Sequence, residues 1–129
     1  MPYPKDFKFT KEHEWAKREN GKVRVGITEY AQGELGDIVY VELPKVGRQV
    51  NQGESIVTIE SVKSVSDVYA PVSGKIAAVN QELETKPELI NQSAHDKGWI
   101  CEIELSKPDE LKNLMDAAAY EKHVGSLKQ

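Results

Sequence analysis

The residue whose type and setting best suit chemistry is Lys63, the one basic side chain in E-S-V-K-S-V-S-D-V-Y-A-P-V-S-G, Glu60 to Gly74. It lies between two β-rich runs, S-I-V-T-I-E-S and S-D-V-Y, so antiparallel pairing of these runs makes V-K-S-V a hairpin connection. A side chain at a hairpin tip projects into water, and a flexible stem ending in an amine can anchor an acyl-linked cofactor. The pattern indicates a carrier module. One alternative stays open: a solvated lysine also discourages edge-to-edge pairing of a valine-rich hairpin.

Other residues that often carry chemistry show no supporting pattern. His13, His95 and His123 are far apart in the sequence and lack the spacing of metal ligands. The single cysteine, Cys101, excludes a CxxC motif, and its position in W-I-C-E-I-E-L favours a buried thiol over a catalytic one. No Gly-rich phosphate loop or G-x-S-x-G elbow is present. These absences favour the carrier module at Lys63 over metal, thiol, phosphate-loop or serine-nucleophile chemistry.

Composition narrows the class of partner. The 129 residues include 17 basic and 21 acidic side chains, which give a net charge of −4, so nucleic acid is not expected as a partner. No run approaches the roughly 20 apolar residues that span a bilayer, and the N-terminal M-P-Y-P-K-D-F-K-F has no apolar signal core. We expect no membrane association, a cytoplasmic location and a single domain over residues 1–129.

Short β-rich runs predict the framework that holds Lys63. Asn20-Gly21 predicts a hairpin turn with positive φ angles, followed by a strand in which alternate residues are apolar: Val23, Val25 and Ile27. Strands of four to seven residues then recur over 37–80, which indicates a small sandwich or barrel. A last strand over 98–106 has one apolar face, made of Trp99, Cys101, Ile103 and Leu105.

Three helical segments are predicted around these strands. A short helix begins after Thr28 as N-cap and ends at Gly36, and K-P-E-L-I-N forms a helical turn. A C-terminal helix begins with Ser106 as cap and Pro108 in its first turn, and its apolar stripe consists of Leu111, Leu114, Met115 and Ala118. Packing of this stripe on the sheet is favoured over a membrane-surface or partner-binding role.

Five blocks of sequence, in order along the chain, resemble the glycine cleavage system H protein, a family of lipoyl carriers. They are T-K-E-H-E-W at 10–15, V-G-I-T-E-Y-A-Q at 25–32, L-G-D-I-V-Y-V-E-L-P at 35–44, the Lys63 stretch at 60–74, and E-L-I-N with G-W near Trp99. The chain departs from the family pattern in two places. Q-S-A-H-D-K stands where the family has D-P-Y, and G-E-L follows the Y-A-Q block. These departures put in doubt a transfer of groove contacts from residues 28–35 and from the loop around His95.

The resemblance implies a fold, and it implies the role of a carrier that is not itself an enzyme. The fold is a mostly β barrel-sandwich hybrid of the lipoyl/biotinyl type, with two small antiparallel sheets, short helices and a C-terminal helix. Lys63 carries lipoic acid through an amide bond made by a lipoate ligase or lipoyltransferase. A pyridoxal-phosphate glycine decarboxylase loads an aminomethyl group, a tetrahydrofolate-dependent aminomethyltransferase unloads it, and dihydrolipoamide dehydrogenase reoxidises the dithiol. A monomer suits a carrier that docks serially with these enzymes.

The resemblance also nominates Glu12, Glu14 and Asp67 as contacts for the carried amine, with Glu14 and Asp67 preferred. Such a cargo is a cation beside a carbon that water attacks, so its groove should supply carboxylates and exclude solvent. Two alternatives stay open: Glu14 as a solvated strand residue, and Asp67 as an acceptor for backbone N–H groups of the hairpin. Trp15 and Trp99 are assigned to the core.

Two alternatives to a glycine cleavage carrier are weighed. One is a lipoyl or biotinyl module of another multienzyme system, and the other is an interaction domain that lost its cofactor. A biotinyl module is disfavoured because the neighbours of Lys63 are Val62 and Ser64, not methionines. Lipoyl domains of 2-oxoacid dehydrogenases resemble only the central part of the chain and lack its extensions over 1–30 and 107–129. An interaction domain that lost its cofactor is disfavoured because Lys63, Glu60 and Asp67 are all present.

Overall fold

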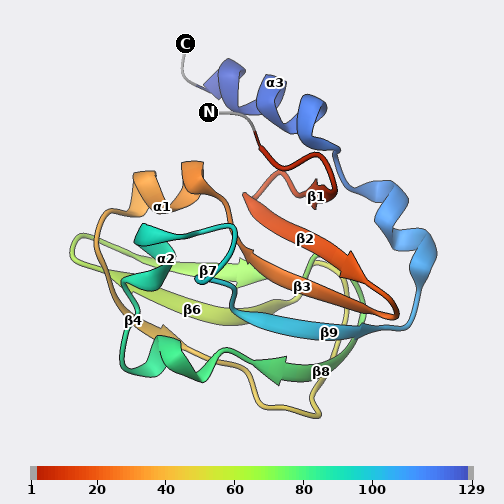
Figure 1. Ribbon diagram of the computed structural model, residues 1–129, viewed down its shortest axis with the longest axis horizontal. Helices are drawn as coiled ribbons and strands as arrows, with labels where there is room; N and C mark the ends of the chain where they lie inside the picture. Colours follow the sequence, from red (N-terminus) through yellow and green to blue (C-terminus); the bar gives the residue numbers. More distant parts are fainter. Residues whose placement is uncertain (1–2, 128–129) are drawn as a thin grey trace.

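Two antiparallel sheets enclose the core of the computed structural model, which describes residues 3–127 (Figure 1). The larger sheet has the strand order β1-β2-β3-β9-β8-β5 and the smaller sheet the order β4-β6-β7. In chain order the elements are β1 (Phe7–Phe9), β2 (Glu14–Glu19), β3 (Lys22–Ile27), α1 (Glu29–Leu35), β4 (Ile38–Glu42), β5 (Gln49–Val50), β6 (Ser55–Ser61), β7 (Val65–Tyr69), β8 (Gly74–Val79), the 3₁₀ helix η1 (Gln81–Glu84), α2 (Leu89–Gln92), β9 (Cys101–Leu105), the 3₁₀ helix η2 (Pro108–Asn113) and α3 (Ala117–Leu127). The predicted mostly β class is confirmed.

The main core lies between the two sheets, and strand alternation fills it. In β3 the predicted apolar face of Val23, Val25 and Ile27 is buried, while Lys22 and Arg24 lie on the other face. In β9, Cys101 and Ile103 are fully buried, and burial raises the pKa of the Cys101 thiol to about 12. The predicted burial of the Cys101 thiol is therefore confirmed.

The turn predicted before β3 and the helix cap predicted after it are both present, with one difference in the turn. The hairpin between β2 and β3 is present, but the left-handed backbone falls on Asn20 (φ 59°) and not on Gly21. Thr28 is the N-cap of α1, since its Oγ1 accepts the Ala31 N–H at 3.2 Å. Gly36 ends the helix with φ 80°, a conformation that glycine adopts without strain.

A second apolar cluster joins α3 to the N-terminal strands. Its buried members are Phe7, Phe9, Trp15, Ala117, Tyr120 and Val124. Trp15 is fully buried, and its indole N–H donates to the Ala94 carbonyl at 2.9 Å. A Cβ on Gly26 would lie 2.6 Å from the Trp15 ring, so this strand position must be glycine. The assignment of Trp15 to the core is confirmed.

The predicted C-terminal helix is present, but α3 begins only at Ala117, and the single helix expected from Ser106 does not form. The chain forms η2, becomes extended at Leu114, and pairs Met115 with Phe9 through two N–H···O contacts of 2.8 Å before α3 begins. The predicted stripe is divided accordingly: Leu111 and Leu114 pack on the main core, Met115 on the second cluster, and Ala118 is exposed. The backbone groups of Met115 bond to β1, which ends the helical ladder at that point.

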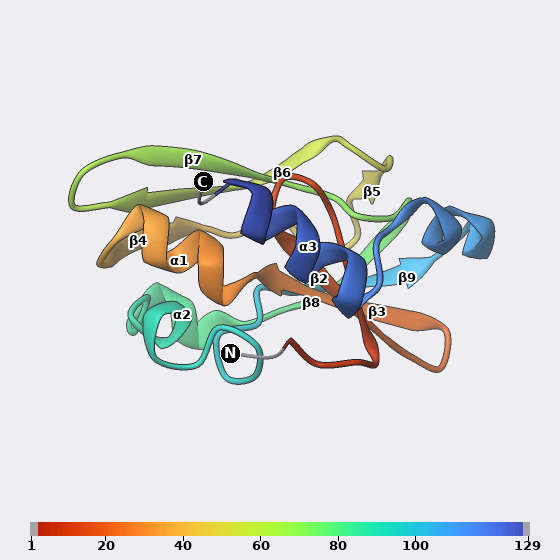
Figure 2. The ribbon, with the colours of Figure 1, turned by 90° about the horizontal axis from the view of Figure 1, so that it is seen from above.

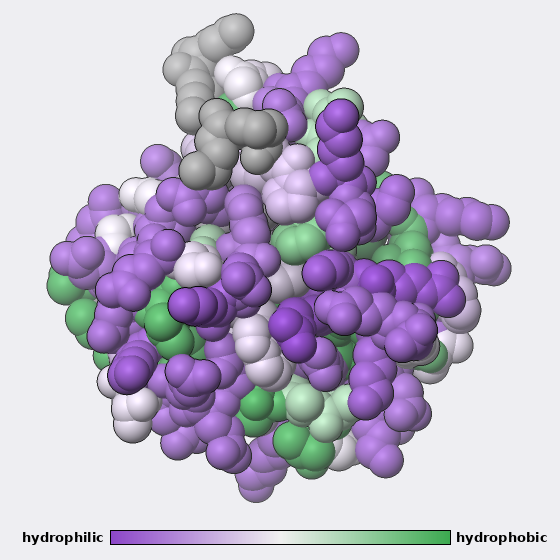
Figure 3. Space-filling model, viewed as in Figure 1, coloured by the Kyte–Doolittle hydropathy of each residue, from purple (hydrophilic) through white to green (hydrophobic). Residues whose placement is uncertain are grey.

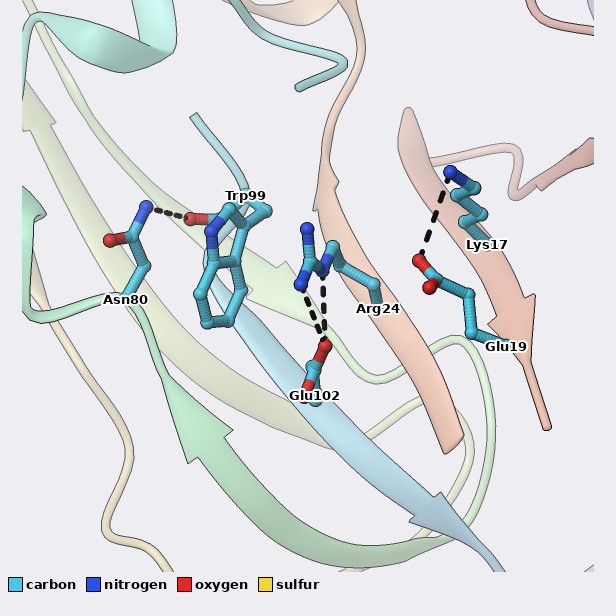
Figure 4. Close-up of polar contacts among 6 residues, drawn as sticks. All are labelled: Lys17, Glu19, Arg24, Asn80, Trp99 and Glu102. Carbon is cyan, nitrogen blue, oxygen red and sulfur yellow. Dashed lines mark hydrogen bonds and ion pairs between the residues drawn. The ribbon is translucent and has the colours of Figure 1, made fainter. Parts of the chain in front are cut away.

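Polar pairs lie on the outer face of the larger sheet, next to the second apolar cluster (Figure 4). Arg24 and Glu102 are opposite each other on β3 and β9, and the guanidinium Nε and Nη2 lie 3.1 and 3.0 Å from one carboxylate oxygen. The same guanidinium lies over the Trp99 ring, 4.5 Å from its centroid. Trp99 is thus half-buried beneath an arginine and packs against the second apolar cluster. It does not share the buried face of Cys101 and Ile103, contrary to the prediction.

Candidate functional site

Lys63 lies at the tip of the hairpin formed by β6 and β7, which projects from the end of the molecule (Figures 1 and 2). Its side chain is exposed, and within residues 3–127 none of the ion pairs involves it. The neighbouring Val62 and Val65 are 67% and 65% exposed. The hairpin expected from the sequence is confirmed, and its amine is open to a modifying enzyme.

The tip is held in a defined conformation by hydrogen bonds from residues on both sides of Lys63. Ser61 Oγ accepts the N–H groups of Lys63 and Ser64 at 3.3 and 3.1 Å, and the Ser61 N–H donates to the Ser64 carbonyl at 2.8 Å. The Val62 N–H donates to the Asp37 carbonyl at 3.0 Å, which ties the tip to the loop after α1. As a result the Lys63 stem runs beside Gly36, where a Cβ would lie 3.5 Å from the lysine Cε.

A cleft of about 280 Å³ begins near this point and runs along α1. One wall is α1 and the other is formed by β6 and β7; Glu12, His13 and Glu14 close the far end. Apolar side chains, among them Leu35, Ile59 and Val68, line much of it. The Lys63 stem lies at the C-terminal end of α1, so the cleft connects the lysine with the Glu12–Glu14 turn.

Glu14 contributes a buried carboxyl group to this cleft. It is 2% exposed, and its carboxylate accepts the Thr10 hydroxyl and, at 3.2 Å, the Tyr69 N–H at the end of β7. Burial raises the Glu14 pKa to about 7, against the hydrogen bonds, which lower it. The alternative of a solvated strand residue is therefore wrong for Glu14.

This pKa predicts a pH dependence of stability. A carboxyl whose pKa rises from its ordinary value of 4.5 to about 7 on folding binds its proton more tightly in the folded state. Glu14 thus stabilises the fold most at low pH and loses that contribution, on the order of 3 kcal/mol, as pH rises through about 7. We expect the free energy of unfolding of wild type minus that of Glu14→Gln, measured in urea, to fall between pH 5 and pH 8. Taking the difference between the two proteins cancels the contribution of His13 and His95. Burial lowers the pKa values of these histidines, so their contribution to stability rises with pH and opposes that of Glu14. A difference independent of pH would contradict the raised pKa.

The other two nominated carboxylates lie at the rim. Glu12 is exposed and lines the cleft beside Glu14. Asp67 also borders the cleft, but it lies opposite Thr58 on the outer face of the smaller sheet, with Thr58 Oγ1 3.5 Å from its Oδ1. The structure therefore brings Glu14 into the cleft and leaves the Asp67 carboxylate in water. Of the two segments that depart from the family pattern, α1 lines the cleft and the loop at His95 does not.

A family model described as "Glycine cleavage H-protein" matches residues 7–126. The chain belongs to the glycine cleavage H-protein family. H proteins are the lipoyl carriers of the glycine cleavage system, with the lipoyl group on a lysine, and are not themselves catalytic. The predicted family, role and cofactor are confirmed, and the components of that system are the class of partner that the family implies.

Curated H proteins match nearly the whole chain. The protein of Staphylococcus saprophyticus is 51% identical over 97% of this chain and 99% of its own length. That of Symbiobacterium thermophilum is 56% identical over 92% of each chain. The crystal structure of the H protein from Mycobacterium marinum superposes with a TM-score of 0.85 at 36% identity, over 95% of this chain and 99% of that one. This likeness confirms the barrel-sandwich hybrid. Within residues 3–127, no helix has the length and apolar character that a membrane span needs.

Sequence reasoning missed several residues that contact Glu14 and His13, two residues that line the cleft. Thr10 and the Tyr69 backbone bind the Glu14 carboxylate, and Tyr120 contacts His13 from the other end of the chain. Each of these contacts except the one from Thr10 joins positions more than 50 residues apart. The only signal in the sequence was Thr10, four residues before Glu14 in the first matching block.

Proposed function

We propose that Lys63 is the lysine of this H protein that carries the lipoyl group, attached by a lipoate ligase or lipoyltransferase. The observation that carries the proposal is an exposed amine at the mouth of a cleft whose far end holds a buried carboxylate. The chain then takes the aminomethyl group from the pyridoxal-phosphate glycine decarboxylase to the tetrahydrofolate-dependent aminomethyltransferase. Dihydrolipoamide dehydrogenase restores the disulfide, and the carrier acts as a monomer.

The dimensions of the cleft fit an arm on Lys63. When bound, the lipoyl group would supply a disulfide, one sulfur of which accepts the aminomethyl carbon while the other becomes a thiol. Counting bonds, the lysine with its acyl chain is roughly 10–15 Å long. The wall of α1 from Leu35 back to Tyr30 rises roughly 8 Å, at about 1.5 Å per residue. An arm that starts beside Gly36 can therefore bring its end to the Glu12–Glu14 turn.

Different residues of the cleft protect the amine and the neighbouring carbon of the carried aminomethyl group. Glu14 supplies a carboxylate for the amine, and a bound cation favours the ionised form of this group. Leu35, Ile59 and Val68 exclude water from the neighbouring carbon, while Glu12 contributes negative charge at the rim. Asp67 contributes at the rim from the outer face of the sheet.

The surface around the lysine suits transient docking of the partner enzymes. Two exposed residues of β4, Val39 and Tyr40, lie on the strand next to β6, in the same sheet as the hairpin that carries the exposed Val62 and Val65. Figure 3 shows apolar surface at the edge of the molecule from which the hairpin projects. Exposed apolar side chains at a mostly polar surface are typical of protein contacts.

Exposure to purified glycine decarboxylase and glycine tests the proposal. We expect the intact mass of the lipoylated chain to increase by one methylamine equivalent, because decarboxylation leaves that part of glycine on the carrier. Adding the aminomethyltransferase with tetrahydrofolate should remove the increment. A 2-oxoacid decarboxylase with its 2-oxoacid serves as control and should leave the mass unchanged. No increment with glycine would contradict the proposed shuttle.

A further inference from the structure

We propose that Tyr120, on the C-terminal helix, is a positioning residue: its hydroxyl fixes the Glu12–Glu14 turn against the N-terminus of α1 and thereby holds Glu14 in the cleft. The part that concerns the carried amine rests on the proposed function. The part that concerns the position of Glu14 does not, and it can be measured on the unmodified protein.

The Tyr120 hydroxyl joins two elements that are remote from α3 in sequence. It lies 2.8 Å from His13 Nδ1 and 2.7 Å from Thr28 Oγ1, and the tyrosine is fully buried. His13 belongs to the turn that closes the cleft, and Thr28 is the N-cap of the helix that forms its wall. One hydroxyl therefore fixes the end of the cleft relative to its side.

One assignment of the protons gives each of these groups a partner. Thr28 Oγ1 already accepts the Ala31 N–H, so its own proton is free to go to the Tyr120 oxygen. The Tyr120 proton is then donated to His13 Nδ1, which must be unprotonated to accept it. Burial, and secondarily the neighbouring His123, lowers the pKa of His13, which agrees with a neutral imidazole. The Thr28 N–H also donates to the His13 carbonyl at 3.0 Å, which makes a second link between turn and helix.

The turn needs such support because its backbone is strained. His13 has φ 76°, a left-handed conformation that few residues other than glycine adopt. Glu14 follows directly, and its N–H donates to Thr10 Oγ1 at 3.0 Å within the same turn. A change in the backbone at His13 is therefore passed to Glu14, and through its carboxylate to the Tyr69 N–H on β7.

Packing of the ring is separate from the role of the hydroxyl. The Tyr120 ring stacks on Phe9 with centroids 4.6 Å apart and planes 10° apart, and it meets Tyr3 edge-on. These contacts do not involve the hydroxyl. Tyr120→Phe therefore removes the chain of hydrogen bonds while keeping the anchor of α3.

Amide hydrogen exchange on the unmodified protein tests the positioning role. In Tyr120→Phe we expect the Ala31 and Tyr69 amides to exchange about tenfold faster than in wild type, because their acceptors lose fixed positions. Val124→Ala is the matched control: it removes a buried side chain from the same helix but leaves the hydroxyl chain intact. After correction for global stability, its Tyr69 amide should exchange as in wild type. Unchanged exchange at Tyr69 in Tyr120→Phe, or an equal increase in both variants, would overturn the proposal.

The lifetime of the carried amine then separates the two proposals. We expect Tyr120→Phe to release ammonia from the loaded carrier about fivefold faster than wild type and Val124→Ala, with the same extent of lipoylation. If wild type gives no more protection than a small dithiol carrying the same cargo, the proposed function of the cleft fails. If wild type protects and Tyr120→Phe protects equally, the cleft stands and the role of Tyr120 is wrong.

Discussion

Replacing Lys63 by arginine is expected to leave the protein without lipoyl modification, whereas wild type expressed in a lipoate-competent host should gain roughly 188 Da, the increment for a lipoyl amide. Arginine keeps the charge and most of the length of lysine, but its guanidinium does not give up a proton in proteins and so cannot act as an amine nucleophile. Lys63 is exposed at a tip that hydrogen bonds of its neighbours hold in place, so the substitution should not disturb the fold. Intact-mass spectrometry reads the result directly.

Lys75→Arg provides the matched control, because Lys75 is also exposed on a strand of the same protein but lies far from the hairpin tip. It should retain the full increment. Wild type that stays unmodified in this host, or Lys63→Arg that still gains the increment, would remove Lys63 from the role of attachment site. Either outcome would favour the structural alternative, in which the lysine only keeps a valine-rich hairpin from pairing with other chains.

The position of Lys63 could be predicted because it depends on local sequence. Two β-rich runs with a four-residue connection specify a hairpin tip, whatever the rest of the chain does. The same holds for the cap of α1, where Thr28 and Gly36 act within one helix. The start of the C-terminal helix could not be predicted, for the opposite reason. The break at Met115 is set by pairing with Phe9, more than 100 residues away, and local helix signals do not contain that contact.

The candidate site was only partly predictable for a related reason. The position of Glu14 in a strand and in a family block was visible in the sequence, but its burial was not. The Glu14 carboxylate accepts the Tyr69 N–H, and the neighbouring His13 contacts Tyr120, and both contacts cross between distant segments. Glu14 and Asp67 were therefore ranked together from the sequence, although the sheet register places the Asp67 carboxylate on the outer face.

The structure now separates these two carboxylates, and Glu14→Gln is expected to shorten the lifetime of the carried amine about tenfold at pH 8, with lipoylation unchanged. Glutamine keeps the size of the side chain and an oxygen for the Tyr69 N–H, but it loses the charge-assisted bond to a cationic amine, worth about 1.5–3 kcal/mol. Asp67→Asn should change the lifetime less than twofold, because its carboxylate is in water, where the attraction is screened. Ammonia release from the loaded carrier measures both.

The pH profile of the same measurement distinguishes charge from shape. The Glu14 pKa of about 7 means that the carboxyl is neutral at pH 5, and a bound cation moves the midpoint to lower pH. The protection given by wild type relative to Glu14→Gln should therefore be large at pH 8 and vanish as pH falls below the midpoint. Equal lifetimes of the two proteins at pH 8 would show that Glu14 is not the partner of the amine. A larger effect of Asp67→Asn would assign that role to Asp67, and would require the hairpin to turn its outer face toward the arm.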